Sequence, residues 1–110
     1  MDDGWVEVCA ADDIDAEDVI RFDHGGQVYA VYRSPDSEYF ATAGICTHER
    51  AFMPDGLVMD DIIECPKHNG RFNYKTGEAR RAPVCVNLQT FPAKVVDGRV
   101  MIKVAEATKA

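Results

Sequence analysis

The chain has 110 residues, of which 46% are hydrophobic, and a formal net charge of −7. This length suits a single domain spanning residues 1–110, and the hydrophobic content excludes a disordered chain. The negative charge excludes a general nucleic-acid binder. It fits equally well protein partners with basic docking surfaces and an acidity that only keeps the protein soluble. No apolar run could span a membrane, and the acidic start MDDGWVEV has no secretory features. We therefore expect a cytoplasmic protein without disulfides.

The first half of the chain predicts strands separated by turns. Alternating or β-branched patterns cover residues 5–9, 19–22, 28–32 and 38–43. The Gly25-Gly26 pair predicts a tight hairpin between the second and third of these segments. The only helical candidate, residues 14–19, is short and acidic, and it predicts no more than a single turn.

The second half continues this pattern and contains one unusual region. Further strands are predicted over residues 56–60, 62–65, 93–96 and 99–104. Turns are predicted at residues 75–77 and at Asp97-Gly98. Many short strands with closely spaced turns predict an all-β, antiparallel sandwich or barrel. The region of about 44–72 carries metal-ligand residues in its loops, and we expect it to form a small sub-domain inserted in that β body.

Four metal-ligating side chains lie in two short segments of this region. Cys46 and His48 are separated by one residue, and Cys65 and His68 are separated by two. The strands predicted between the two segments would bring both to one end of a small sheet. Zinc is one interpretation, although zinc sites usually take two cysteines from one loop. A 2Fe-2S cluster is the other, because one iron can take both cysteines and the second iron both histidines.

The motifs CTH and CPKHNG resemble the C-x-H and C-x-x-H cluster-binding motifs of the Rieske family. Nearly the whole chain looks like a soluble bacterial Rieske-type ferredoxin. The resemblance implies a Rieske-type β fold with two cluster-binding loops and one 2Fe-2S cluster of the Rieske type. Cys46 and Cys65 would bind the inner iron, and His48 and His68 would bind the outer iron near the surface.

The same resemblance implies an electron carrier with no catalysis of its own. It would pass single electrons from a flavin-containing, NAD(P)H-dependent ferredoxin reductase to a terminal Rieske non-haem iron oxygenase. The system would hydroxylate or demethylate aromatic compounds, and we expect the carrier to be a monomer. One alternative is a small structural zinc-binding interaction module. Another is a nitrite-reductase-type small subunit, which ranks low because such proteins often lack the four ligands present here.

Residues near the ligands predict a low reduction potential. Respiratory-chain Rieske proteins place hydroxyl side chains where this chain has Gly70 and Phe72, and hydrogen bonds to sulfur raise the potential. Those proteins also carry a disulfide between the loops, at positions that match Ala51 and Lys67 here. Residues 82–84 match a segment that covers the cluster in the family. Without the hydroxyls and the disulfide, we predict a midpoint potential below zero.

Overall fold

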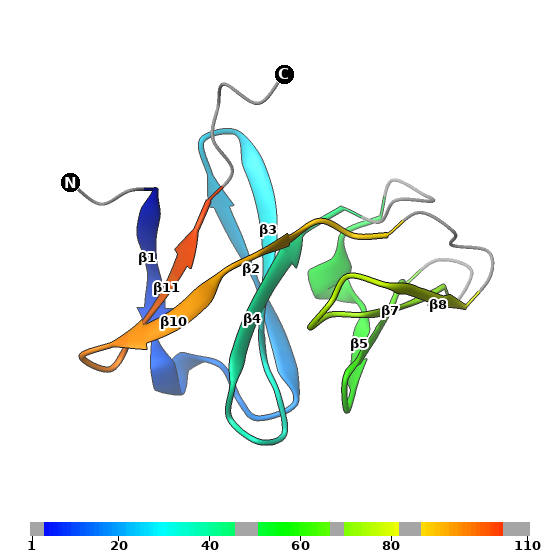
Figure 1. Ribbon diagram of the computed structural model, residues 1–110, viewed down its shortest axis with the longest axis horizontal. Coiled ribbons are helices and arrows are strands. Elements are labelled where there is room, and N and C mark those ends of the chain that lie inside the picture. Colours follow the sequence, from blue (N-terminus) through cyan, green and yellow to red (C-terminus); the bar gives the residue numbers. More distant parts are fainter. Residues whose placement is uncertain (1–3, 46–50, 67–69, 82–86, 105–110) are drawn as a thin grey trace.

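The computed structural model describes residues 4–45, 51–66, 70–81 and 87–104 of the chain, which form three antiparallel sheets (Figure 1). The first sheet has the order β1-β11-β10 and contains β1 (Trp5–Ala10), β10 (Ala93–Val96) and β11 (Arg99–Lys103). The second has the order β2-β3-β4-β9 and contains β2 (Asp18–His24), β3 (Gln27–Arg33), β4 (Tyr39–Ala43) and β9 (Thr90–Phe91).

The third sheet follows chain order, and it contains β5 (Leu57–Met59), β6 (Ile62–Glu64), β7 (Arg71–Asn73) and β8 (Ala79–Arg81). Two short 3-10 helices, η1 (Ala11–Asp13) and η2 (Met53–Asp55), complete the described elements. No α-helix occurs in the described part of the chain, so the all-β prediction is confirmed.

Tight turns form where the sequence predicts them. Gly25 and Gly26 have φ angles of 58° and 80°, and they join β2 to β3 with His24 paired to Gln27. Asp97 and Gly98 have φ angles of 52° and 78° and join β10 to β11 in the same way. Positive φ at both central residues matches the twist of antiparallel strands and favours glycine.

The helical candidate at residues 14–19 is wrong. The single helical turn is η1, which ends at Asp13, and β2 already begins at Asp18. Ile14 is fully buried and packs into the core between the first two sheets. Ile14 has an extended backbone, with φ −111° and ψ 121°, and Glu17 has a positive φ of 58°, and neither conformation fits a right-handed helix.

The first two sheets pack together and form the body of the molecule. Their shared core contains side chains from β3, β4 and β11 together with Ile14: Tyr29, Val31, Ala41, Val100 and Ile102. Successive side chains of a strand point to opposite faces, so Ala30 and Tyr32 of β3 lie on the other face of the second sheet. These two residues belong to a different core, and β3 is therefore buried on both faces.

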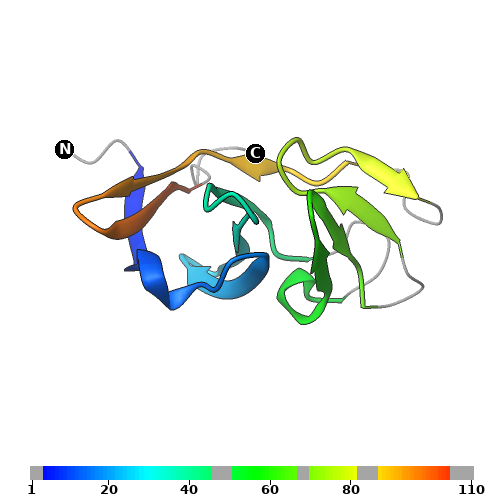
Figure 2. The ribbon, with the colours of Figure 1, turned by 90° about the horizontal axis from the view of Figure 1, so that it is seen from below.

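The second core joins the body to the third sheet. It contains side chains from β5, β6 and β7, among them Val58, Ile63 and Phe72, packed with Ala30 and Tyr32 of β3. Figures 1 and 2 show the third sheet beside the body in both views. This sheet continues to Arg81, beyond the region of about 44–72, and the division of the chain into a body and a sub-domain stays a prediction.

Candidate metal centre

The first ligand segment leaves the body at the end of β4 and returns to it at η2. Ile45 pairs with Phe52 in an isolated antiparallel bridge, and the Met53 amide donates a 2.8 Å hydrogen bond to the Gly44 carbonyl oxygen. These contacts close the base of the first loop, residues 46–51. Cys46 and His48 lie outside the described residues, so the structure leaves their predicted roles untested.

The second ligand segment is the connection between β6 and β7. Glu64 and Arg71 are the last register pair of these strands, and the Cys65 amide donates a 2.6 Å hydrogen bond to the Gly70 carbonyl oxygen. This bond closes the base of the second loop, residues 65–70. Lys67 and His68 lie outside the described residues, as do residues 82–84.

The bases of the two loops share one core. Ala51, which precedes the bridge residue of the first loop, and Cys65, which begins the second, both belong to the core that joins the body to the third sheet. The side chain of Met53 lies in this core as well, fully buried. The fold therefore anchors both ligand segments on the same packed group of side chains.

The described part of the predicted site suits a cluster with a buried thiolate end. The Cys65 side chain is buried, with 1% of its surface exposed. A hollow of about 440 Å³ lies beside it and is lined by Asp55, Gly56, Leu57, Glu64 and Pro66. Thiolate is a soft ligand that iron–sulfur clusters use. Gly70 and Phe72, both buried, bring no hydroxyl group to the loop. No group of three ligand-type side chains converges among the described residues, which include one of the four predicted ligands.

The third sheet is held to the body by an aromatic contact that the sequence did not reveal. The rings of Tyr74, just after β7, and Tyr32 of β3 stack with centroids 4.5 Å apart and an interplanar angle of 7°. Phe40 of β4 packs edge-on against the Tyr74 ring. Both tyrosines are fully buried. Offset aromatic pairs contribute about 0.5–1.5 kcal/mol beyond the area they bury, so this contact stabilises the join between the sheets.

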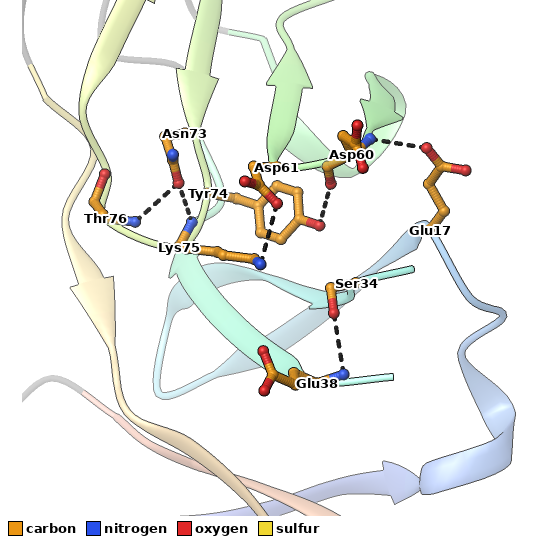
Figure 3. Close-up of polar contacts among 9 residues, drawn as sticks. All are labelled: Glu17, Ser34, Glu38, Asp60, Asp61, Asn73, Tyr74, Lys75 and Thr76. Carbon is orange, nitrogen blue, oxygen red and sulfur yellow. Dashed lines mark hydrogen bonds and ion pairs between the residues drawn. The ribbon is translucent and has the colours of Figure 1, made fainter. Parts of the chain in front are cut away.

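Polar contacts surround this aromatic group at the turn between β5 and β6 (Figure 3). The Tyr74 hydroxyl donates to the Asp60 carbonyl oxygen, and the Asp60 amide donates to the Glu17 carboxylate at 2.8 Å. Lys75 forms an ion pair of 3.1 Å with Asp61. Burial, followed by the nearby carboxylates of Asp61, Asp60 and Glu17, raises the pKa of Tyr74 to about 12. The phenol therefore stays protonated and able to donate at neutral pH.

The predicted turn at residues 75–77 is confirmed, and Asn73 organises it. The Asn73 side-chain oxygen accepts hydrogen bonds from the Lys75 and Thr76 amides, and its main-chain carbonyl oxygen accepts one from the Gly77 amide at 2.6 Å. The Gly77 carbonyl oxygen in turn accepts a bond from the Leu88 amide. An asparagine side chain that accepts from the amide two residues on is a common turn element, so Asn73 could have marked the start of this turn in advance.

The chain matches the family model described as "Rieske [2Fe-2S] domain" over residues 4–92. It is 43% identical over 98 residues to the ferredoxin component of the naphthalene 1,2-dioxygenase system of Pseudomonas putida, covering 89% of this chain and 93% of that protein. Among solved structures, a ferredoxin of Sphingomonas yanoikuyae B1 matches with a TM-score of 0.85 and 32% identity, covering 91% of this chain and 98% of the other.

A second solved structure is the complex of reduced oxygenase and oxidised ferredoxin in carbazole 1,9a-dioxygenase. A chain of it matches with a TM-score of 0.84 and 38% identity, covering 88% of this chain and 99% of that one. A small subunit named for an NADH-dependent nitrite reductase, from Mycobacterium tuberculosis, matches at 24% identity with a TM-score of 0.81, covering 93% of this chain and 96% of its own. That identity shows a shared fold alone. Within the described residues, no helix is long and apolar enough to cross a membrane.

Proposed function

Because the chain belongs to the Rieske [2Fe-2S] domain family, we propose that it carries single electrons from a flavin-containing, NAD(P)H-dependent ferredoxin reductase to a terminal Rieske non-haem iron oxygenase. It binds one Rieske-type 2Fe-2S cluster. The observation that carries the proposal is the likeness, over most of both chains, to proteins named as ferredoxin components of dioxygenase systems. The proposal includes that this chain has no catalysis of its own.

We assign the cluster to the four ligands of the two loops. Cys46 and Cys65 would hold one iron, and His48 and His68 would hold the other. When bound, such a cluster accepts and releases one electron at a time. The burial of Cys65 supports its assignment to the inner iron, and the common core under both loop bases supports ligands from both loops meeting at one centre.

The partners follow from charge and from the comparisons. A net charge of −7 favours encounter with basic surfaces, because complementary charge speeds association. The match to a chain in a complex of oxygenase and ferredoxin supports direct docking on a terminal oxygenase. We propose that the protein works as a monomer in the cytoplasm, and that the oxygenase hydroxylates or demethylates an aromatic compound.

Composition and spectroscopy of the purified protein test this function. We expect equal amounts of iron and acid-labile sulfide, and a rhombic EPR signal after reduction with dithionite. Reoxidation of that reduced protein by a ring-hydroxylating oxygenase would complete the test. A colourless protein with one tightly held zinc would instead establish the zinc-binding module.

Substitution of two cysteines tests the ligand assignment. Cys65→Ser should abolish the cluster, because serine supplies no soft thiolate ligand. Cys9→Ser is the matched control, since Cys9 lies on β1 in the first sheet and is only half-buried. The control should retain the full iron and sulfide content. Equal retention in both variants would remove Cys65 from the ligand set.

A further inference from the structure

An ion pair closes the base of the second ligand loop. Glu64 and Arg71 stand opposite each other on β6 and β7, one residue outside the bond between the Cys65 amide and the Gly70 carbonyl oxygen. Their strand neighbours Ile63 and Phe72 are fully buried in the core. Side chains alternate between the faces of a sheet, so Glu64 and Arg71 share the opposite, outer face.

The two charges of this pair lie close together but share no hydrogen bond. Arg71 Nη2 lies 3.8 Å from Glu64 Oε1, which is within ion-pair range but too long for a hydrogen bond. Arg71 Nε is buried and has no hydrogen-bond acceptor among the described residues. The Glu64 side chain is 17% exposed, and it lines the hollow beside Cys65. The Arg71 side chain is 37% exposed, with its Nε atom buried, so shielding from water is strongest at Glu64. Both side chains flank the same short loop.

Another arginine–carboxylate pair in the described residues is more exposed to water than this one. Arg99 Nη2 lies 2.5 Å from Glu7 Oε2, and both side chains are about half exposed, at 47% and 51%. That pair joins β11 to β1 in the first sheet, and water screens its charges. Glu64 is far less exposed than Glu7, whereas Arg71, at 37%, is only somewhat less exposed than Arg99. Reduced screening at Glu64 lets its field reach further into its surroundings.

We propose that Glu64 and Arg71 act as opposed charges that set the reduction potential of the cluster held by the second loop. The inference rests on the proposed electron-carrier function. In a bound cluster, one electron from a flavin reductase, or from dithionite in vitro, would convert one ferric ion to ferrous and add one negative charge to the site. The Arg71 guanidinium stabilises this added charge, and the Glu64 carboxylate opposes it. The positive charge of Arg71 thus raises the reduction potential, and the negative charge of Glu64 lowers it.

A double-substitution cycle on the isolated holoprotein tests this proposal. Arg71→Gln should lower the midpoint potential, and Glu64→Gln should raise it, each measured by a redox titration followed through visible circular dichroism. Each change should alter the equilibrium constant for reduction by up to about tenfold, which corresponds to 59 mV for one electron. The double variant should return close to the wild-type potential, because it removes both charges.

Two controls separate charge from structure. Arg71→Lys keeps the positive charge without the guanidinium group and should keep the wild-type potential. Arg99→Gln removes an arginine from the distant first sheet and should leave the potential unchanged. Thermal unfolding, iron content and the EPR signal of every variant report on the integrity of the loop. Arg71→Gln could fail to retain its cluster. In that case, a raised midpoint potential in Glu64→Gln together with an unchanged potential in Arg71→Lys still supports the proposal.

Three outcomes would overturn the inference. The first is an unchanged midpoint potential in Glu64→Gln, and the second is a change of the potential in the same direction in Glu64→Gln and Arg71→Gln. The third is a change of the potential in Arg71→Lys as large as in Arg71→Gln. The last two would indicate that the pair only keeps the loop closed. None of these bears on electron transport itself, because the titration needs no partner protein. A wild-type protein without a 2Fe-2S cluster would instead overturn the proposed function.

Discussion

At the scale of single residues, Gly77 shows how closely the chain packs near the third sheet. Its φ angle is +83°, a conformation that residues with a side chain rarely adopt. A Cβ atom at this position would also lie against the Leu88 carbonyl oxygen, far inside contact distance. Gly77 binds Asn73 and Leu88 through its main chain, so the turn has little freedom to move away.

We expect Gly77→Ala to destabilise the protein much more than Gly25→Ala. Gly25 also has a positive φ, +58°, but nothing lies within 4 Å of its added Cβ. The Gly25 variant should lose about 1 kcal/mol of unfolding free energy through backbone strain alone. The Gly77 variant should lose at least about 3 kcal/mol, because the steric clash adds to the strain. Chemical denaturation measures both values, and similar losses would mean that the turn relaxes easily.

At the scale of elements, β3 lies between two cores, one inside the body and one beside the bases of the ligand loops. One face of β3 contributes Tyr29 and Val31 to the core of the body, and the other contributes Ala30 and Tyr32 to the core that contains Cys65. Of these two cores, the second contains the described residues Ala51 and Cys65 at the bases of the ligand loops, and the first contains neither. Packing defects in the two cores should therefore differ in their effect on the cluster, even where their effect on stability is similar.

Ile63→Ala and Ile102→Ala form a matched pair for this expectation. Both isoleucines are fully buried, Ile63 in the core with Cys65 and Ile102 in the core of the body. Each substitution should cost about 2–5 kcal/mol of unfolding free energy, because it leaves a cavity. Only Ile63→Ala should speed the loss of visible absorbance on mild heating or chelation. Equal rates of bleaching in the two variants would contradict a separate role for the two cores.

At the scale of the whole molecule, the third sheet depends on its contacts with the body and with the loops. It joins the body through the second core, the stacked Tyr32 and Tyr74 rings, and the hydrogen bond from the Asp60 amide to Glu17. Its four strands have three residues each, so little of its stability comes from the sheet alone. A bound cluster would add to it, because metal-binding energy is partly folding energy.

Removal of iron should therefore loosen the third sheet before the body. In native-state hydrogen exchange, the amides of β5, β6 and β7 should lose protection in the apoprotein, whereas those of β1, β10 and β11 should change little. Peptide-level exchange measured by mass spectrometry resolves the two regions. A uniform loss of protection over both regions would show that the cluster stabilises the molecule as one cooperative unit.

The sequence determined the class of fold, most of the strands and the family, because alternation, glycine turns and ligand spacing are local signals. The hairpin at Gly25-Gly26 and the turn at residues 75–77 were predictable in this way. Only the tertiary structure placed Ile14 in a core, stacked Tyr74 on Tyr32, and brought Glu64 beside Arg71 at the base of the second loop. The first two contacts depend on sheet packing between segments distant in the sequence, and the third depends on the register of β6 on β7, which the ligand spacing alone does not specify.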